Sequence, residues 1–361
     1  MGLGRLSVVA PEAGATPTGA CGCGPAVYQV KRVLVTGVGG FVGSHLLRHL
    51  LTTTDWHVVG LDSFRHHGKL DRIQYQLEGQ DRSRYTHLVY DLSIPFSDQF
   101  VERIGHIDYV LNLASESHVE RSIEDPRPFV ENNVALMLTL LEWARYENGI
   151  EKFIQISTDE TMGPILAGGH KEGAPHRPSN PYSASKAMQE DLAYSYWRTY
   201  GVPVVITNTM NLIGPLQDPE KFVPKVIRAI GRGDTVPVHA DKDGVPGTRF
   251  YLHAESQADA LVFLLGQIGL AMYPADDLDR FNVVSGVELD NLSLAHLIAE
   301  FMGKSLTYEL VDFHISRPGH DRRYGLDGSK MAALGWTPPG DFYDQLRSTV
   351  EWFVAHPEWL L

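Results

Sequence analysis

The sequence predicts an α/β protein of the Rossmann type, with a doubly wound parallel sheet and a smaller C-terminal lobe. Short β-branched runs alternate with helical patterns between Val27 and Thr207, and a glycine-rich turn follows the first run. After Thr207 the order is less regular and richer in Pro, Gly and charged residues. We therefore expect a flexible tail over 1–26, a Rossmann domain over 27–207, and a ligand-facing lobe over 208–361 from which some segments return to the Rossmann domain.

The elements of the Rossmann domain follow from the periodicity of apolar residues. Six short aliphatic runs predict buried parallel strands, over 31–36, 56–62, 85–91, 107–113, 152–157 and 202–207. Apolar residues at helical spacing predict helices between these strands, over 43–52, 129–147 and 182–200. Strands that are joined by helices of this length form right-handed crossovers, which give a parallel sheet covered on both faces.

Composition and charge exclude several classes of protein. With 361 residues, 43% hydrophobic and 21% charged, the chain is neither disordered nor a coiled coil. The excess of 44 acidic over 31 basic residues gives a formal charge of −13, which opposes binding to nucleic acids or anionic membranes. No apolar run reaches the roughly 18 residues of a membrane helix. We therefore expect neither a nucleic-acid nor a membrane partner.

The first 26 residues are rich in Gly, Ala and Pro and have no apolar period. This composition predicts a flexible tail or translation from an upstream start codon, with a signal peptide as the minor alternative. Both cysteines, Cys21 and Cys23, lie there. Two incidental thiols are favoured over a soft-metal ligand pair, and no metal site is expected. Because a disulfide framework is missing, we expect a reducing, cytoplasmic location.

The glycine-rich turn at 36–43 lies between the first predicted strand and the first predicted helix. Glycines there allow the backbone to approach a pyrophosphate at the helix N-terminus. Asp62 ends the second strand, where an acid binds the adenine-ribose hydroxyls and repels a 2′-phosphate, which predicts NAD rather than NADP. Asp91 ends the third strand, where a side chain meets the adenine. The alternative, a glycine turn with an unrelated acid downstream, does not account for the correct order of all these elements.

Two further motifs carry groups for catalysis. Tyr182 and Lys186 lie four residues apart on one predicted helix, so their side chains share a face. A nearby ammonium favours tyrosinate, which predicts that Tyr182 acts as a base while Lys186 holds the nicotinamide ribose. At the end of the fifth strand, Asp159 and Glu160 can supply one acid and one base if their pKa values differ. The structural alternative for the first motif is a surface Tyr/Lys pair, and for the second it is a helix cap or a solvated turn.

These motifs resemble those of the extended short-chain dehydrogenase/reductases, and within them the NDP-sugar 4,6-dehydratases, from about Lys31 to the C-terminus. The segments that carry the resemblance are 112–123, 157–160, 211, 214–224, 249, 317–324 and 334–338. The Thr-Asp-Glu motif at 158–160 and the run at 317–321 are specific to that family, whereas the glycine and Tyr/Lys motifs are shared by the whole superfamily. Met162 and the segment 212–213 depart from the family pattern, as does the longer turn at 239–248.

The resemblance implies a set of site residues. The catalytic residues would be Thr158, Asp159, Glu160, Tyr182 and Lys186. NAD would contact Gly37, Gly40, Phe41, Val42, Gly43, Asp62, Ser63, Asp91, Leu92, Leu113, Ala114, Ser115, Tyr182 and Lys186. The nucleotide sugar would contact Ser117, Thr158, Asn211, Lys221, Phe222, Arg249, Arg317, His320 and Arg323. A homodimer formed through two helices of each cofactor domain is implied as well.

The resemblance also implies a reaction in three stages on one bound sugar. Tyr182 removes the proton of the C4 hydroxyl while C4 gives hydride to NAD⁺, assisted by Thr158 and Lys186. Glu160 then removes the C5 proton, and Asp159 protonates the departing C6 hydroxyl. Hydride returned to C6 completes a 4-keto-6-deoxy sugar.

Two other classes of function remain open. Epimerases, decarboxylases and 5,6-dehydratases of nucleotide sugars also use transient oxidation at C4. The pair of Asp159 and Glu160 favours the 4,6-dehydratase over an epimerase but does not exclude elimination without the final reduction. The second class is an NAD-binding regulator without catalysis, and the complete set of catalytic residues argues against it.

Overall fold

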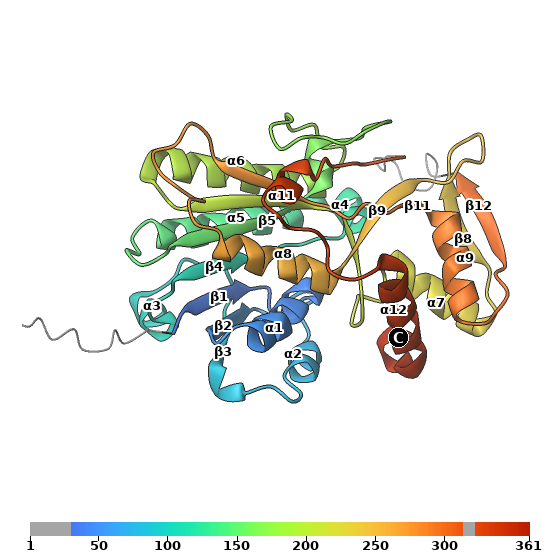
Figure 1. Cartoon of the computed structure of the whole chain (residues 1–361), viewed down its shortest axis with the longest axis horizontal. Coiled ribbons are helices and arrows are strands. Elements are labelled where there is room, and N and C mark those ends of the chain that lie inside the picture. Colours follow the sequence, from blue (N-terminus) through green and yellow to red (C-terminus); the bar gives the residue numbers. More distant parts are fainter. Residues whose placement is uncertain (1–29, 313–321) are drawn as a thin grey trace, which may run out of the picture. The chain divides into compact units, whose positions relative to one another are not determined.

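The structure, a computed structural model, describes residues 30–312 and 322–361 (Figure 1). The predicted tail over 1–26 lies outside the described residues, as do Arg317 and His320. Among the residues that are described, no helix is both long enough and apolar enough to cross a membrane.

A seven-stranded parallel sheet forms the Rossmann domain, in the order β10-β6-β5-β4-β1-β2-β3. Its strands are β1 Arg32–Thr36, β2 His57–Asp62, β3 Tyr85–Val89, β4 Tyr109–Asn112, β5 Lys152–Thr158, β6 Val204–Thr209 and β10 Asp279–Val283. All six predicted strands are present, and the Rossmann-type fold is confirmed. The strand order reverses between β1 and β4, which is where ligands bind in sheets of this kind.

Helices cover both faces of this sheet (Figure 1). One face packs against α1 Phe41–Thr53, α2 Leu70–Gln76 and α8 Ala254–Gly266. The other packs against α3 Asp98–Ile104, α5 Pro126–Ala144 and α6 Pro181–Tyr200. Each face of the sheet has its own hydrophobic core. Successive side chains of β1 point to opposite faces, so Val33 and Val35 belong to the first core and Leu34 belongs to the second. The remaining short helices here are η1 Arg82–Arg84, α4 Val119–Glu124, η2 Asp159–Met162 and α11 Ser329–Ala333.

The C-terminal lobe has a core of its own. It contains a three-stranded sheet in the order β11-β9-β7 and a parallel pair of β12 and β8. Their bounds are β7 Asn211–Ile213, β8 Val236–Ala240, β9 Thr248–His253, β11 Glu288–Asp290 and β12 Tyr308–Asp312. The helices of this lobe are α7 Phe222–Arg232, α9 Asn291–Phe301, α12 Phe342–Ala355 and η3 Pro357–Leu360. Ile227, Leu294 and Phe353 are buried where these helices meet.

Local sequence signals position the elements that carry the site. The side chain of Asn180 caps α6 by accepting a hydrogen bond of 2.9 Å from the Ser183 backbone N–H. The Ser183 hydroxyl in turn accepts a hydrogen bond from the Asn180 backbone N–H. Pro181 takes the first helical position, and Gly201 ends the helix with φ of +70°. Tyr182 therefore lies in the first turn of α6. The third strand ends at Val89, two residues earlier than predicted, so Asp91 lies in the turn that follows it.

Candidate active site

A cavity of about 920 Å³ opens at the carboxyl ends of β1, β4 and β5 and extends to α7 and β9. Most of the predicted site residues line it. Those that do are Gly37, Gly40, Phe41, Val42, Gly43, Asp62, Ser63, Asp91, Leu92, Leu113, Ala114, Ser115, Ser117, Thr158, Asp159, Glu160, Tyr182, Lys186, Asn211, Lys221, Phe222 and Arg249. The fold thus brings together residues that are up to 212 positions apart in the chain, from Gly37 to Arg249.

The glycine-rich turn is packed too closely for side chains. A Cβ atom on Gly43 would lie 2.1 Å from the carbonyl oxygen of Gly37, and one on Gly37 would lie 2.9 Å from the backbone nitrogen of Ala114. Gly37 also has φ of +68°. No side chain caps α1 at Gly40, and the first turn of this helix lines the cavity. The first N–H groups of a helix have no partner within the helix, which is the arrangement that suits a pyrophosphate.

The carboxylate of Asp62 links this turn to the loop after β2. One oxygen accepts a hydrogen bond of 2.9 Å from Gly39 N, and the other accepts one of 2.9 Å from Phe64 N. A carboxylate has further acceptor positions, and Asp62 lines the cavity. The carboxylate of Asp91 lies at the same end and forms an ion pair with Arg65. The glycine turn, the helix N-terminus and these acids fit a dinucleotide.

The adjacent carboxyl groups of Asp159 and Glu160 have different surroundings. Asp159 is 4% exposed, and burial together with the neighbouring charge of Glu160 raises its pKa to about 7. Thr158 donates a hydrogen bond of 3.1 Å to Oδ1 of Asp159. Asn180 donates one of 3.0 Å to Oε2 of Glu160. The carboxyl of Asp159 is therefore suited to hold a proton at neutral pH, whereas the carboxylate of Glu160 is held by the amide of Asn180.

Tyr182 and Lys186 lie one turn apart on α6, and both line the cavity. Burial lowers the pKa of Lys186 to about 8, and its ammonium donates hydrogen bonds to Ile156 O at 2.8 Å and Gln189 Oε1 at 2.7 Å. The pKa of Tyr182 is raised by burial and by the carboxylates of Glu160 and Asp159. The direction is opposite to the one expected from Lys186, because burial and two negative charges act on the phenol.

Two predicted substrate residues, Lys221 and Arg249, lie on the side of the cavity near α7 and β9. Lys221 donates a hydrogen bond of 3.2 Å to the carbonyl of Ser117, and burial lowers its pKa. Arg249 donates to Arg322 O at 2.9 Å, and its guanidinium lies 5.0 Å from the centre of the Tyr324 ring. The positive charge of Arg249 also opposes the rise in the pKa of Asp159. Both cations are thus held at the cavity, where an anionic ligand can reach them.

Arg323 does not line the cavity. Its guanidinium forms hydrogen bonds of 2.6 and 3.0 Å with the carboxylate of Glu288 and donates to the carbonyls of Ile165 and Gly168. Its charge is paired with Glu288, and its contact with the substrate stays a prediction. Arg317 and His320 lie outside the described residues.

One side of α7 is basic and was not predicted from the sequence. Lys225, Arg228 and Arg232 line the cavity together with Lys221. Their spacing of three or four residues places them on one side of a helix, and this periodicity was the signal that could have found them. Glu116, His118, Tyr251 and Asn291 also line the cavity. Among the described residues, no cluster of His, Cys, Asp or Glu could hold a metal ion.

The fold and the site define a nucleotide-binding enzyme of the extended short-chain dehydrogenase/reductase type. A family model described as GDP-mannose 4,6 dehydratase matches residues 34–349, and the chain belongs to this family of NDP-sugar 4,6-dehydratases.

Individual relatives agree with this family. The chain is 38% identical over 328 residues to the low-salt glycan biosynthesis protein Agl12 of Haloferax volcanii, covering 90% of this chain and 99% of that protein. It is 34% identical over 355 residues to a dTDP-glucose 4,6-dehydratase of Escherichia coli, covering 91% and 94%. The crystal structure of DesIV, a dTDP-glucose 4,6-dehydratase from Streptomyces venezuelae with NAD and TYD bound, superposes with a TM-score of 0.81 at 32% identity, covering 91% and 98%.

Proposed function

We propose that this protein dehydrates a nucleotide-activated hexose of the dTDP- or UDP-glucose type to a 4-keto-6-deoxy sugar, with NAD as its cofactor. The observation that carries the proposal is the carboxyl pair of Asp159 and Glu160 beside Tyr182 in one cavity. The relatives named above as dTDP-glucose 4,6-dehydratases support the same reaction class.

The residues present fit NAD. The turn at 36–43 and the N-terminus of α1 would hold the pyrophosphate, and Asp62 and Asp91 would lie toward the adenosine. NAD⁺ supplies the hydride acceptor for the oxidation at C4, and its positively charged ring favours the deprotonated phenol of Tyr182. The carboxylate of Asp62 disfavours NADP, because it would repel a 2′-phosphate.

Tyr182 and Thr158 act on the C4 hydroxyl in this proposal. The deprotonated phenol of Tyr182 removes the hydroxyl proton, and the hydroxyl of Thr158 only partly opposes the rise in the pKa of Tyr182 that burial and the two carboxylates cause. Lys186 is held by Ile156 O and Gln189 Oε1, one turn from Tyr182, where its ammonium can hold the nicotinamide ribose. The 4-ketone that forms makes the C5 proton more acidic.

Glu160 and Asp159 then act on C5 and C6. Glu160 removes the C5 proton, and its carboxylate is oriented by Asn180. Asp159 gives its proton to the departing C6 hydroxyl, which leaves as water; a pKa of about 7 keeps a large fraction of this carboxyl protonated at neutral pH. The C5–C6 double bond that results would then take back the hydride at C6 and the proton held by Glu160 at C5, which gives the 4-keto-6-deoxy sugar. Adjacent residues thus serve opposite roles because their environments differ.

Cations on the side of the cavity near α7 and β9 would hold the diphosphate of the substrate. Lys221 and Arg249 line the cavity there, and the basic side of α7 extends this positively charged surface. Because the diphosphate is bound in the same way throughout the reaction, these residues contribute to substrate binding more than to the chemical steps.

Product masses and proton NMR test the proposal. The protein is incubated separately with dTDP-glucose, UDP-glucose and GDP-mannose. We expect at least one substrate to lose water and to gain a C6 methyl signal. Loss of water without a methyl signal would indicate a 5,6-dehydratase. An unchanged mass with altered sugar stereochemistry would indicate an epimerase. Loss of carbon dioxide from a nucleotide-linked uronic acid would indicate a decarboxylase, and no conversion at all would favour a regulator.

A homodimer is a further part of the proposal. Leu138 on α5 and Met188, Tyr194 and Tyr200 on α6 are exposed apolar or aromatic side chains on two neighbouring helices. A four-helix interface formed by α5 and α6 of two copies would cover them. Light scattering during gel filtration measures the oligomeric state directly.

The cytoplasmic location stays a prediction from the two-cysteine composition.

A further inference from the structure

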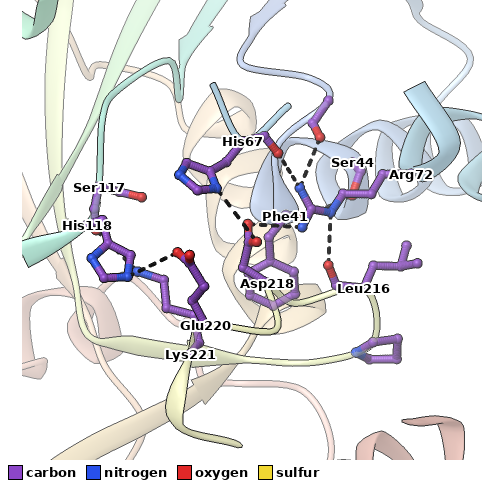
Figure 2. Close-up of polar contacts among 12 residues, drawn as sticks. Phe41, Ser44, His67, Arg72, Ser117, His118, Leu216, Asp218, Glu220 and Lys221 are labelled. Atoms are coloured by element: carbon purple, nitrogen blue, oxygen red, sulfur yellow. Dashed lines mark hydrogen bonds and ion pairs between the residues drawn. The ribbon is translucent and has the colours of Figure 1, made fainter. Parts of the chain in front are cut away.

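We propose that Arg72 is a positioning residue that fixes the segment 214–221 beside the glycine-rich turn and thereby holds Lys221 in the cavity. The inference rests on the proposed function, because it concerns how the nucleotide-sugar side of the cavity is built. Figure 2 shows Arg72 between the 63–69 loop, which carries His67, and the segment that carries Leu216 and Asp218.

Arg72 is fully buried, and its guanidinium joins three parts of the chain. Nε donates to Leu216 O at 2.9 Å, and Nη2 donates to the carboxylate of Asp218 at 3.1 Å. Nη1 donates to His67 O at 2.7 Å and to Gly39 O at 3.4 Å. A planar fork of donors can reach four acceptors at once, whereas a lysine ammonium cannot span them.

The segment 214–221 has a backbone that needs such support. Leu216 is fully buried and has φ of +66°, a left-handed conformation that costs free energy for a residue other than glycine. Its carbonyl is the acceptor for Arg72. The preceding carbonyl, of Pro215, lies 2.8 Å from Nε2 of the buried His45 on α1. The segment 214–221 is therefore attached to two helices of the Rossmann domain, α1 through His45 and α2 through Arg72.

Asp218 is the charged partner of Arg72. Its carboxylate also lies 3.7 Å from Nδ1 of His67, so two groups of the 67–72 region hold it (Figure 2). Arg72, His67 and their hydrogen bonds lower the pKa of Asp218, which keeps it ionised. Within the described chain, the carboxylate of Asp218 is the only negatively charged group that contacts the guanidinium of Arg72. Breaking this buried pair would leave a guanidinium without a counter-charge.

The position of Asp218 determines that of Lys221. The backbone N–H of Lys221 donates to Asp218 O at 3.0 Å, and α7 begins at the next residue, Phe222. The side chain of Lys221 then reaches Ser117 O across the cavity. Glu220, between them, is held by Arg121 at 2.5 Å and by His118 at 3.2 Å. Contacts of Arg72 with Leu216 and Asp218 are thus transmitted directly to a residue that faces the ligand.

Three variants test the inference, with a matched control. Asp218→Asn keeps the shape but removes the charge, Arg72→Lys keeps the charge but removes the fork, and the double variant combines both. Arg48→Lys is the control, because Arg48 also contacts α2, through Gln76 O at 3.4 Å, and does not line the cavity. Steady-state kinetics give kcat and KM, and calorimetry gives Kd for dTDP, UDP and GDP.

We expect each single variant to raise KM, and Kd for the nucleotide that the wild type binds, by about tenfold, with kcat within about threefold. The double variant should be less impaired than the product of the single effects, because both remove one interaction. A change of Kd and KM below threefold in Asp218→Asn overturns the inference, as does a fall in kcat alone. If Arg72→Lys does not fold, Asp218→Asn decides. A wild-type chain that binds none of the three nucleotides contradicts the proposed function, and the inference falls with it.

Discussion

Thr158 donates a hydrogen bond of 3.1 Å to Oδ1 of Asp159, whereas Oδ2 of Asp159 is buried and has no hydrogen-bond partner in the part of the chain that the structure describes. The two oxygens of one carboxyl are therefore unequal. The first is fixed by a neighbour, and the second is left for a group that is not part of the protein. A sugar hydroxyl is such a group.

The activity should depend on the protonation of Asp159. Because an acid must carry its proton, and the pKa of Asp159 is raised to about 7, kcat should decrease as the pH rises above about 7. Asp159→Asn should lower kcat by about 10²–10⁴-fold and abolish this inflection. A second inflection near 8, from Lys186, should persist in the variant. A variant that retains the inflection near 7 would assign it to another group.

The same carboxyl should reduce stability at neutral pH. Its pKa in the folded chain, about 7, lies above the ordinary value of about 3.9, so the folded state binds more protons between these values. Its contribution to the free energy of unfolding therefore falls as the pH rises from about 4 to 7. Asp159→Asn removes this dependence. The Tm of the variant relative to the wild type should be higher at pH 8 than at pH 5, and equal differences at both pH values would contradict the shift.

Glu160 and Tyr182 should act in separable steps. Glu160→Gln keeps the shape and a hydrogen-bonding group but removes the base that acts after the ketone exists. With substrate, this variant should show a rise in the absorbance band of the reduced nicotinamide, together with a 4-keto sugar that retains its C6 hydroxyl. Tyr182→Phe should show neither, because the first proton cannot be removed. Normal turnover in Glu160→Gln would reduce Glu160 to a structural partner of Asn180 and bring the epimerase forward.

A methyl group at Gly43 should disrupt the cofactor site. The Cβ atom of Gly43→Ala would lie 2.1 Å from Gly37 O, so the turn and α1 must move apart. We expect the bound NAD, measured by its absorbance after denaturation, to be largely lost. Gly231→Ala is the control, because that helical position on α7 has no neighbour within 4 Å. It should gain about 0.5–1 kcal/mol in stability and retain the cofactor.

A buried carboxylate behind the site should be important for stability. Glu190 on α6 is fully buried and accepts hydrogen bonds from Ser157 at 2.5 Å and Asn208 at 2.8 Å, while Arg280 and His176 pair with it at 2.5 and 3.1 Å. Glu190→Gln leaves Arg280 without its counter-charge and should cost about 3–5 kcal/mol in denaturant unfolding.

The pH dependence and an exposed pair provide the controls for this prediction. The pKa of Glu190 is lowered to about 2, so its contribution to stability is present above about 4.3 and is lost as the pH falls toward 2. The variant should lack this part of the acid sensitivity. Glu131→Gln breaks the exposed pair with Arg127 and should change stability by less than about 0.5 kcal/mol. Similar costs for the two variants would exclude the buried network as the cause.

The sequence was informative wherever one local signal determined the structure. The glycine turn and Asp62, each at the end of a strand, and Tyr182, in the first turn of a capped helix, have local signals, and all three line the cavity. The pairing of Arg323 with Glu288 could not be predicted, because Glu288 lies 35 residues earlier and no periodicity links two such residues. The basic side of α7 has a local signal in its helical spacing of charge, but only the fold shows that this side lines the cavity. Arg72 carries no motif at all, since its role depends on the distant groups of Gly39, Leu216 and Asp218 as well as on the nearby carbonyl of His67.

The seventh strand of the large sheet comes from far along the chain. β10 pairs with β6, whose residues Val204–Thr209 are all buried, and it forms this edge of the sheet only after some 70 further residues have been added to the chain. A chain that ends before Asp279 would leave β6 as an unprotected apolar edge, the kind of surface that pairs with other chains. During synthesis on the ribosome, the Rossmann domain would therefore remain prone to aggregation until about half of the C-terminal lobe has been made. Expression of 27–207 alone should yield insoluble protein, although this segment contains the entire glycine-rich turn and Tyr182.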